Sequence, residues 1–257
     1  MVRIGAFALL FSATFVSLVA AASERPNVIV MVADDLGWAD VGFHGNPIIE
    51  TPALDRIAAE GVQLNRFYTT PICSPTRAAL MTGRDPIRLG VAYSTIMPWH
   101  NNGIHPEETF LPELFLDAGY QTAMVGKWHL GDLEQNSPEN QGYDYAYYGL
   151  FNGAPDAWPA AQHVNEQPSP IKAPFYDFPG EDVYKEWTGI DMSIVGYVGQ
   201  KGKGRKPIEG VAGKLGEGRQ EAFEEESIAQ IKQYIVDQAQ DEAPFFIYWA
   251  TYTAQIH

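Results

Sequence analysis

Three strand-like segments constrain the fold of this chain more than any other feature of its sequence. Residues 26–33 and 244–250 are mostly apolar and do not alternate with polar residues, and residues 120–125 form a shorter segment of the same kind. Such runs are typical of strands that are buried on both faces of a parallel sheet. Segments with helix signals lie between them, at 51–61, 111–119 and 220–240. The pattern predicts an α/β fold with a mostly parallel central sheet and helices on both faces.

Two other regions carry weaker signals. Residues 51–61 begin with Thr-Pro, end in Gly and place apolar residues at helical spacing, which predicts a helix that packs in the core. Residues 62–70 alternate apolar and polar residues and predict a strand that leads to Cys73. From 136 to 218 the periodicity fades, and we expect long loops with short elements that line a substrate mouth.

The composition places the 257-residue chain among ordinary globular proteins, with 46% hydrophobic and 19% charged residues. Its net charge of −15 argues against nucleic acid as a partner. The same charge means that an anionic substrate needs a local positive field at its binding site. The length suits one large domain or part of a longer protein.

The first residues have the pattern of an export signal. Arg3 precedes an apolar run from 4 to 19, and small residues follow at 20–23. We predict a signal peptide over 1–22 that is cleaved near Ala22, and hence an exported protein, periplasmic or secreted. An uncleaved membrane anchor is the alternative.

Cys73, the only cysteine, lies in a segment that predicts the start of a helix. Pro75 suits the first helical position, the residues after it are strong helix formers, and Gly83 can end the helix. Free N–H groups and the helix dipole at such an end favour an anion, and Arg77 lies one turn further on the same side. The alternative is that Cys73 is a buried apolar residue and Arg77 a surface charge.

Charged residues follow two of the predicted strands. Asp34 and Asp35 come after the first strand, where open α/β sheets place ligands, and their oxygens suit Ca²⁺ or Mg²⁺. Lys127 and His129 follow the second strand and, two apart, point to the same side, where they can bind an oxyanion and handle a proton. The alternatives are an acidic turn that caps a helix, a surface lysine and a core histidine.

Three motifs together resemble the sulfatase family. Cys73-x-Pro75-x-Arg77 followed by Thr-Gly at 82–83 is similar to the family signature, Gly-Lys-Trp-His-Leu-Gly at 126–131 is a second match, and residues 25–37 are a third. Residues 87–90 and 111–114 look like the arylsulfatase A and B group.

The resemblance implies an alkaline-phosphatase-like catalytic domain over 23–257. It implies that a maturation enzyme oxidises Cys73 to the catalytic aldehyde formylglycine. It also implies that Asp34, Asp35 and the modified Cys73 hold a divalent cation, Ca²⁺ or else Mg²⁺. Lys127 and His129 would then contact the sulfate group and formylglycine, with Arg77 neutralising charge beside them.

The family pattern also covers the end of the chain. Family members carry a histidine, usually after Pro, shortly beyond a strand like 244–250, where it serves as an acid or a sulfate ligand; here His257 follows Ile256. A further Asp-Asn pair and a lysine of the family lie beyond this point. We therefore expect the chain to be the N-terminal, incomplete portion of a longer protein.

The resemblance predicts a sulfuric ester hydrolase of the arylsulfatase type, acting on a sulfated small molecule or polysaccharide. Formylglycine would hydrate to a gem-diol, of which one hydroxyl attacks sulfur and the other expels sulfate. Two alternatives stay open. One is a formylglycine-dependent phosphonate or phosphate ester hydrolase. The other is an inactive truncated binder of sulfated glycans that uses the basic cluster at 201–206.

Overall fold

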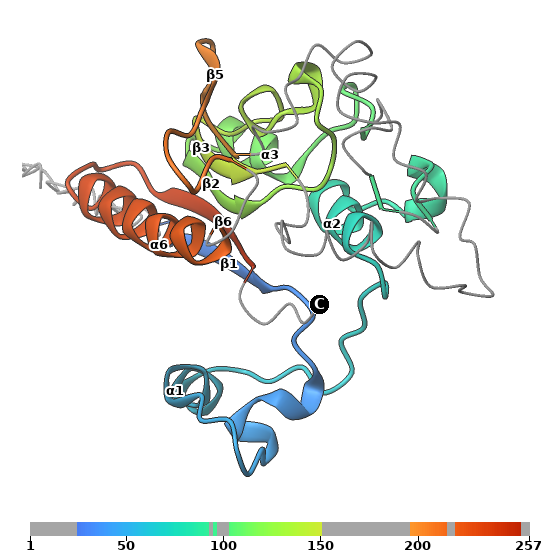
Figure 1. The fold of residues 1–257 in the computed structure, drawn as a ribbon, viewed down its shortest axis with the longest axis vertical. Coiled ribbons are helices and arrows are strands. Elements are labelled where there is room, and N and C mark those ends of the chain that lie inside the picture. Colours follow the sequence, from blue (N-terminus) through green and yellow to red (C-terminus); the bar gives the residue numbers. More distant parts are fainter. Residues whose placement is uncertain (1–24, 93–94, 97–102, 151–195, 215–218, 253–257) are drawn as a thin grey trace, which may run out of the picture.

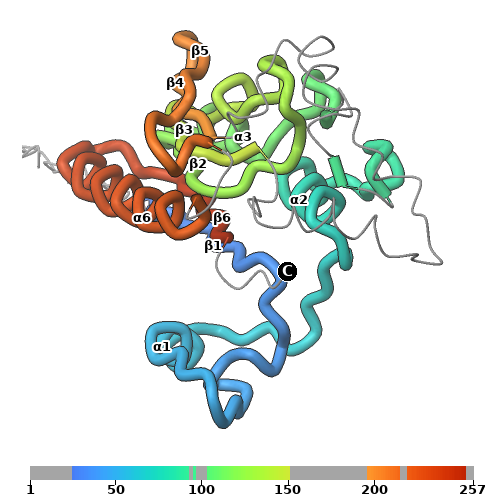
Figure 2. Tube along the Cα trace, in the orientation of Figure 1, coloured from blue at the N-terminus to red at the C-terminus, as the bar shows by residue number. Residues whose placement is uncertain are grey.

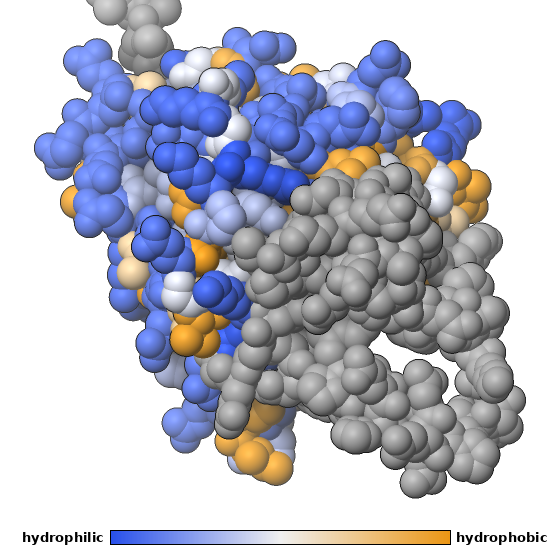
Figure 3. Space-filling model, turned by 45° about the horizontal axis from the view of Figure 1, so that its top comes forward, coloured by the Kyte–Doolittle hydropathy of each residue, from blue (hydrophilic) through white to orange (hydrophobic). Residues whose placement is uncertain are grey.

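The computed structural model describes residues 25–92, 95–96, 103–150, 196–214 and 219–252 (Figure 1). The predicted signal peptide and His257 lie outside this part of the chain. Within the same ranges, no helix combines the length and the apolar character needed to cross a bilayer. Among the coloured residues in Figure 3, hydrophilic ones predominate.

A six-stranded sheet forms the centre of the fold, in the order β1-β6-β2-β3-β4-β5. Its strands are β1 (Val28–Ala33), β2 (Gln121–Lys127), β3 (Tyr145–Gly149), β4 (Gly196–Gln200), β5 (Gly204–Pro207) and β6 (Phe245–Thr251). The first four in spatial order run parallel, and β4 and β5 are antiparallel to their neighbours. The segments predicted as buried strands are β1, β2 and β6, so the prediction of a mostly parallel sheet is confirmed. β2 and β6 are buried as predicted, but the predicted burial of β1 on both faces is wrong, because β1 is an edge strand of the described sheet and Ile29 and Met31 are 48% and 42% exposed.

Helices cover both faces of the sheet. The α-helices are α1 (Pro52–Glu60), α2 (Cys73–Thr82), α3 (Leu111–Asp117) and α6 (Arg219–Gln238). Short 3-10 helices are η1 (Trp38–Asp40), η2 (Gly42–His44), η3 (Pro86–Leu89), η5 (Glu134–Asn136) and η6 (Pro138–Asn140). On one face, Phe246 and Tyr248 of β6 share a core cluster with residues of α2 and α3. On the other face, Phe245 and Ile247 pack against α6. Because successive strand residues point to opposite faces, β6 must be apolar throughout.

The segment after β1 departs from two predictions. The helix predicted at 51–61 is present as α1, but none of its residues is buried, so its predicted core packing is wrong. Residues 62–70 form no strand, and Val62 and Tyr68 are 89% and 85% exposed. Figure 2 shows this part of the chain, coloured blue to cyan, outside the layers of the sheet and its helices. An alternating pattern makes a strand only where another strand can pair with it.

The region from 136 to 218, predicted as long loops with short elements, contains the short strands β3, β4 and β5. β3 pairs with the free edge of β2, and β4 and β5 form a hairpin that extends the sheet. Residues 151–195, in the middle of this region, lie outside the described part. Tyrosines give β3 a high strand propensity, but only pairing with β2 settles the choice between strand and loop.

Candidate active site

The carboxyl ends of β1 and β2 meet at one edge of the sheet, with β6 between them. Asp34 and Asp35 directly follow β1, and Lys127 is the last residue of β2. α2 begins beside them at Cys73, and one ligand atom from each of Asp34, Asp35 and Cys73 lies within 4.8 Å of the others. The structure therefore brings together the three residues predicted to hold a cation, at the edge where open α/β sheets bind ligands.

Asp34 is the centre of a buried charge cluster. It is 6% exposed, and its Oδ2 accepts a hydrogen bond from the Nζ of Lys127, which is fully buried. Its Oδ1 lies 3.4 Å from Nη2 of Arg77. One buried carboxylate thus faces two buried cations, so the buried groups here carry a net positive charge; the second carboxylate, Asp35, is exposed. The alternative reading of Lys127 as a surface residue is wrong.

Arg77 is held by two further hydrogen bonds. Its Nη1 donates to the carbonyl oxygen of Lys127 at 2.9 Å and to the hydroxyl of Tyr248 at 2.8 Å. With an exposure of 2%, Arg77 is not a surface charge. Burial opposes its charge, but Tyr248 and Asp34 outweigh that effect and raise the pKa of Arg77. The guanidinium therefore stays charged and fixed in place.

The start of α2 differs slightly from the prediction. The helix begins at Cys73, so Pro75 occupies its third position instead of its first. The first N–H groups of a helix have no partner within it, so the missing N–H of Pro75 costs nothing there either. Gly83 ends the helix in the left-handed conformation, at φ 65°, as predicted. The first turn of α2 therefore lies beside Asp34.

Two pKa shifts describe the environment of this cluster. Burial raises the pKa of the Cys73 thiol; Lys127 opposes the shift and Asp34 adds to it. Burial and the charge of Arg77 lower the pKa of Lys127, against the effect of Asp34. An unmodified Cys73 is therefore a neutral thiol at pH 7, despite its place at a helix N-terminus.

His129 is buried beside the cluster with an unusual backbone. Its exposure is 0% and its φ is +59°, a conformation that residues other than glycine rarely adopt. Among the described residues, neither ring nitrogen has a hydrogen-bond partner. Burial, Lys127 and Arg77 together hold the pKa of His129 well below its usual range. The ring is a neutral, unpartnered polar group, and such groups are costly to bury without a ligand.

Sequence reasoning missed two residues that shape the site. The Oγ of Ser74 donates to the carbonyl oxygen of His129 at 2.8 Å and accepts from the N–H of Ile96 at 2.9 Å. Gly126 has φ +109°, and a Cβ there would lie 1.8 Å from the carbonyl oxygen of Ala250. Both residues lie inside motifs quoted above, but a motif does not reveal which contact its residues make.

Trp128 turns away from the cluster, as predicted. Its Nε1 donates to the carbonyl oxygen of Asn136 at 2.8 Å, and its ring is fully buried near Phe110. The expected reason was the alternation of a strand, but β2 ends at Lys127. The left-handed turn at His129 and its anchor at Ser74 place the imidazole instead.

The basic cluster of the β4–β5 hairpin lies at the other end of the sheet. Gln200, just before the cluster, pairs with Tyr145 at the amino end of β3. Because β3 runs parallel to β2, the hairpin turn is remote from the carboxyl end that carries Lys127. Lys201, Lys203 and Lys206 are exposed, whereas Arg205 is partly buried and donates to the carbonyl oxygen of Asp132 at 2.7 Å.

Comparison with known proteins identifies close relatives by sequence. The chain is 36% identical over 242 residues to the N-acetylgalactosamine-6-sulfatase of Rattus norvegicus, covering 91% of this chain and 40% of that protein. It is 40% identical over 126 residues to arylsulfatase A of Homo sapiens, covering 48% and 25% respectively. The chain thus spans about two fifths of the length of the first of these relatives.

Two solved structures superpose on most of this chain. The PsFucS1 sulfatase from Pseudoalteromonas sp. superposes with a TM-score of 0.65 at 26% identity, over 91% of this chain and 44% of that one. Ps i-CgsB in complex with k-i-k-neocarrahexaose gives 0.60 at 29% identity, over 90% and 46%. The fold is alkaline-phosphatase-like, as predicted. The Sulfatase family pattern matches residues 26–254, and this chain therefore belongs to the sulfatase family.

Proposed function

We propose that the protein containing this chain hydrolyses sulfate esters at the edge formed by β1, β2 and α2. The observation that supports this most is the charge at that edge. Lys127 and Arg77 are both buried against the single buried carboxylate of Asp34, in a chain whose net charge is −15. Buried cations in excess have a large effect on an anion because little water screens them.

Position 73 would carry the nucleophile. We propose that Cys73 is converted to formylglycine, whose hydrated form supplies one hydroxyl that attacks sulfur and a second that later expels sulfate. Arg77, one helical turn away, and Lys127 would hold the sulfate oxygens while the bond to the leaving alcohol breaks. The raised pKa of Cys73 supports the need for such a conversion, because the thiol itself is neutral.

The donor set fits a hard divalent cation only in part. Asp34 and Asp35 offer carboxylate oxygens, which Ca²⁺ and Mg²⁺ prefer, whereas the sulfur of Cys73 is a soft ligand. An oxygen at position 73 would make the three donors uniform. We propose that these residues hold Ca²⁺, or else Mg²⁺, which would lower the pKa of a bound hydroxyl and offset sulfate charge.

His129 would bind the substrate as a neutral ring. Its buried nitrogens have no partner among the described residues, so a sulfate oxygen or the nucleophile would satisfy one of them. A neutral imidazole is a poor proton donor at pH 7, so we assign protonation of the leaving alcohol to His257, which lies outside the described residues.

The test uses the full-length protein, coexpressed with a formylglycine-generating enzyme. We expect hydrolysis of nitrophenyl sulfate, its complete loss in Cys73→Ala, and an aldehyde at position 73 in the mass spectrum of the corresponding peptide. A higher kcat/KM for a nitrophenyl phosphonate would identify a phosphonate ester hydrolase instead. Full activity in Cys73→Ala would refute the mechanism.

The natural substrate would be a sulfated sugar. Relatives are named N-acetylgalactosamine-6-sulfatase, and a structural neighbour is named for its complex with k-i-k-neocarrahexaose. We further propose that the protein is exported after cleavage near Ala22. Expression with the native leader, followed by N-terminal sequencing of the exported product, tests this; an intact leader on the product would contradict it.

A further inference from the structure

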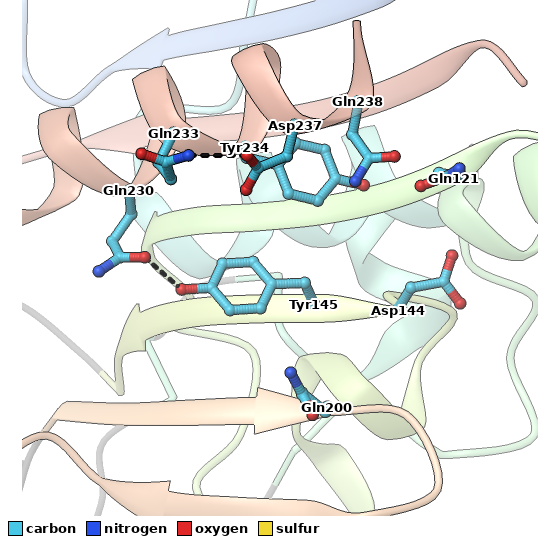
Figure 4. Close-up of a pocket in the computed structure, with 9 residues that line it drawn as sticks. All are labelled: Gln121, Asp144, Tyr145, Gln200, Gln230, Gln233, Tyr234, Asp237 and Gln238. Carbon is cyan, nitrogen blue, oxygen red and sulfur yellow. Dashed lines mark hydrogen bonds between the residues drawn. The ribbon is translucent and has the colours of Figure 1, made fainter. Parts of the chain in front are cut away.

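A pocket lies at the opposite end of the strands from the candidate active site. It has a volume of about 340 Å³ and is enclosed by α6, the amino ends of β2 and β3, and the end of β4 (Figure 4). Gln121, which lines it, is the first residue of β2, and Lys127 is the last. At about 3.3 Å per residue, the two sites are roughly 20 Å apart.

Every lining residue of this pocket is polar. Five glutamines, two aspartates and two tyrosines form its walls. Amides supply both donors and acceptors, carboxylates supply acceptors, and phenols supply either. No lysine or arginine is among them, and Asp144 and Asp237 would repel a sulfate or phosphate group. The lining therefore suits an uncharged ligand rich in hydroxyl groups.

One wall of the pocket comes from the C-terminal part of α6, where polar side chains lie beside the buried side of the helix. Phe223 and Ile231 lie on the side facing the sheet and are buried. Three and seven residues beyond Ile231, Tyr234 and Gln238 continue this side but are only half-buried. Ile235 continues the apolar contact with the core, and the polar groups of Tyr234 and Gln238 lie beside it.

Two tyrosines provide an aromatic wall. The rings of Tyr145 and Tyr234 are stacked, with centroids 6.0 Å apart and planes 19° apart. The hydroxyl of Tyr145 donates to Oε1 of Gln230 at 2.7 Å, as Figure 4 shows. Aromatic rings pack against the C–H face of a sugar while amides beside them bind its hydroxyls.

Hydrogen bonds hold several of these amides in place before any ligand arrives. Nε2 of Gln233 donates to Asp237 at 2.7 Å, and Oε1 of Gln200 accepts from Lys203 at 2.9 Å. The bond from Tyr145 occupies Oε1 of Gln230 and leaves its Nε2 for a ligand. Groups that are oriented in advance lose less entropy on binding.

We propose that this pocket is a non-catalytic binding site for an uncharged sugar unit. The pocket itself is independent of the proposed function; only the choice of sugar rests on it. If the active site removes sulfate from a polysaccharide, the unsulfated units of the same polymer fit a pocket whose lining includes two aspartates and no lysine or arginine. Binding there would keep the enzyme on its substrate between cleavages.

The experiment measures binding of N-acetylgalactosamine and of its 6-sulfate to the full-length Cys73→Ala protein, by saturation-transfer NMR. An excess of inorganic sulfate competes for the active site and leaves the pocket free. We expect the unsulfated sugar to bind in this excess. Binding should weaken by about tenfold in Gln233→Ala and in the double variant Tyr145→Phe/Gln230→Ala, which lose one or two hydrogen bonds.

The matched control is Gln240→Ala. Gln240 is exposed and lies just beyond the end of α6, outside the pocket, so its removal should leave binding unchanged. Loss of sugar binding in excess sulfate, or equal binding by the pocket variants and the control, would overturn the proposal. Tighter binding of the 6-sulfate in excess sulfate would also overturn it. Hydrolysis of nitrophenyl sulfate by the same variants with Cys73 intact should stay normal, which separates this test from that of the proposed function.

Discussion

The hydroxyl of Ser74 holds the backbone of His129 from 55 positions away, donating to its carbonyl oxygen at 2.8 Å where both residues are fully buried. The Oγ of Ser74 also accepts a hydrogen bond from the N–H of Ile96. Through this contact the residue after Cys73 fixes the left-handed turn that presents the imidazole. The helix that begins at Cys73 and the turn that carries His129 are therefore directly linked.

We expect Ser74→Ala to lower kcat/KM by about tenfold to a hundredfold, because the His129 turn and the N–H of Ile96 each lose a buried partner. Stability should fall by roughly 1–3 kcal/mol. Steady-state kinetics and urea unfolding measure both effects. Because Ser74 lies within the motif that we propose is modified, the mass of the peptide with position 73 must show normal conversion. Ser74→Thr, which keeps the hydroxyl, should recover part of the activity; equal losses in both variants would contradict the positioning role.

Tyr248→Phe should lower kcat/KM by about tenfold, because a hydrogen bond to a charged guanidinium contributes about 1.5–3 kcal/mol. The variant removes only the hydroxyl that receives the Nη1 of Arg77. Tyr147→Phe is the control, because Tyr147 belongs to the core cluster on the opposite face of the sheet and its hydroxyl donates to Glu226 of α6. Steady-state kinetics with nitrophenyl sulfate compare kcat/KM of the two variants. The same loss in both would mean that the effect is one of general stability.

Gly126→Ala should destabilise the fold by more than about 3 kcal/mol and leave little soluble protein. Its Cβ would lie 1.8 Å from the carbonyl oxygen of Ala250, and its φ is +109°. Gly210→Ala separates the clash from backbone strain, because its φ is +81° and its Cβ would meet nothing within 4 Å. We expect this control to cost only about 1–2 kcal/mol. Chemical denaturation compares the two, and equal losses would rule out the contact with β6 as the cause.

Asp34→Asn should abolish hydrolysis and the stabilising effect of Ca²⁺. The substitution leaves the buried Lys127 and Arg77 without their carboxylate, a change that typically costs about 3–5 kcal/mol. Thermal unfolding with added Ca²⁺ and with a chelator measures the stabilising effect of Ca²⁺. In the parent protein, Ca²⁺ should raise Tm. Asp117→Asn, an exposed substitution on α3, should respond to Ca²⁺ like the parent. A Tm rise that survives in Asp34→Asn would show that the cation binds elsewhere.

The local sequence was sufficient to predict three strands, β1, β2 and β6, and the residues of the charge cluster. β1, β2 and β6 carry apolar runs typical of parallel strands, and parallel pairing brings their carboxyl ends to the same end of the sheet. Asp34 and Lys127, one at each of two such ends, are brought together for that reason. Only β2 and β6 are covered on both faces, whereas one face of β1 is exposed. The helix at Cys73 could be predicted as well, because its start and end depend on neighbouring residues alone.

Only the tertiary structure decided the rest. Residues 62–70 have the alternation of a strand but no strand to pair with, and β3 formed in a predicted loop because the edge of β2 accepted it. The sequence indicates only that Tyr248 is a core residue, and the structure shows that its hydroxyl accepts a hydrogen bond from Arg77, 171 positions away. The proposed sugar-binding pocket likewise joins residues of β2, β3, β4 and α6 that are distant in sequence. Pairing, burial and such contacts arise between distant segments, whereas a sequence pattern records only what each segment prefers by itself.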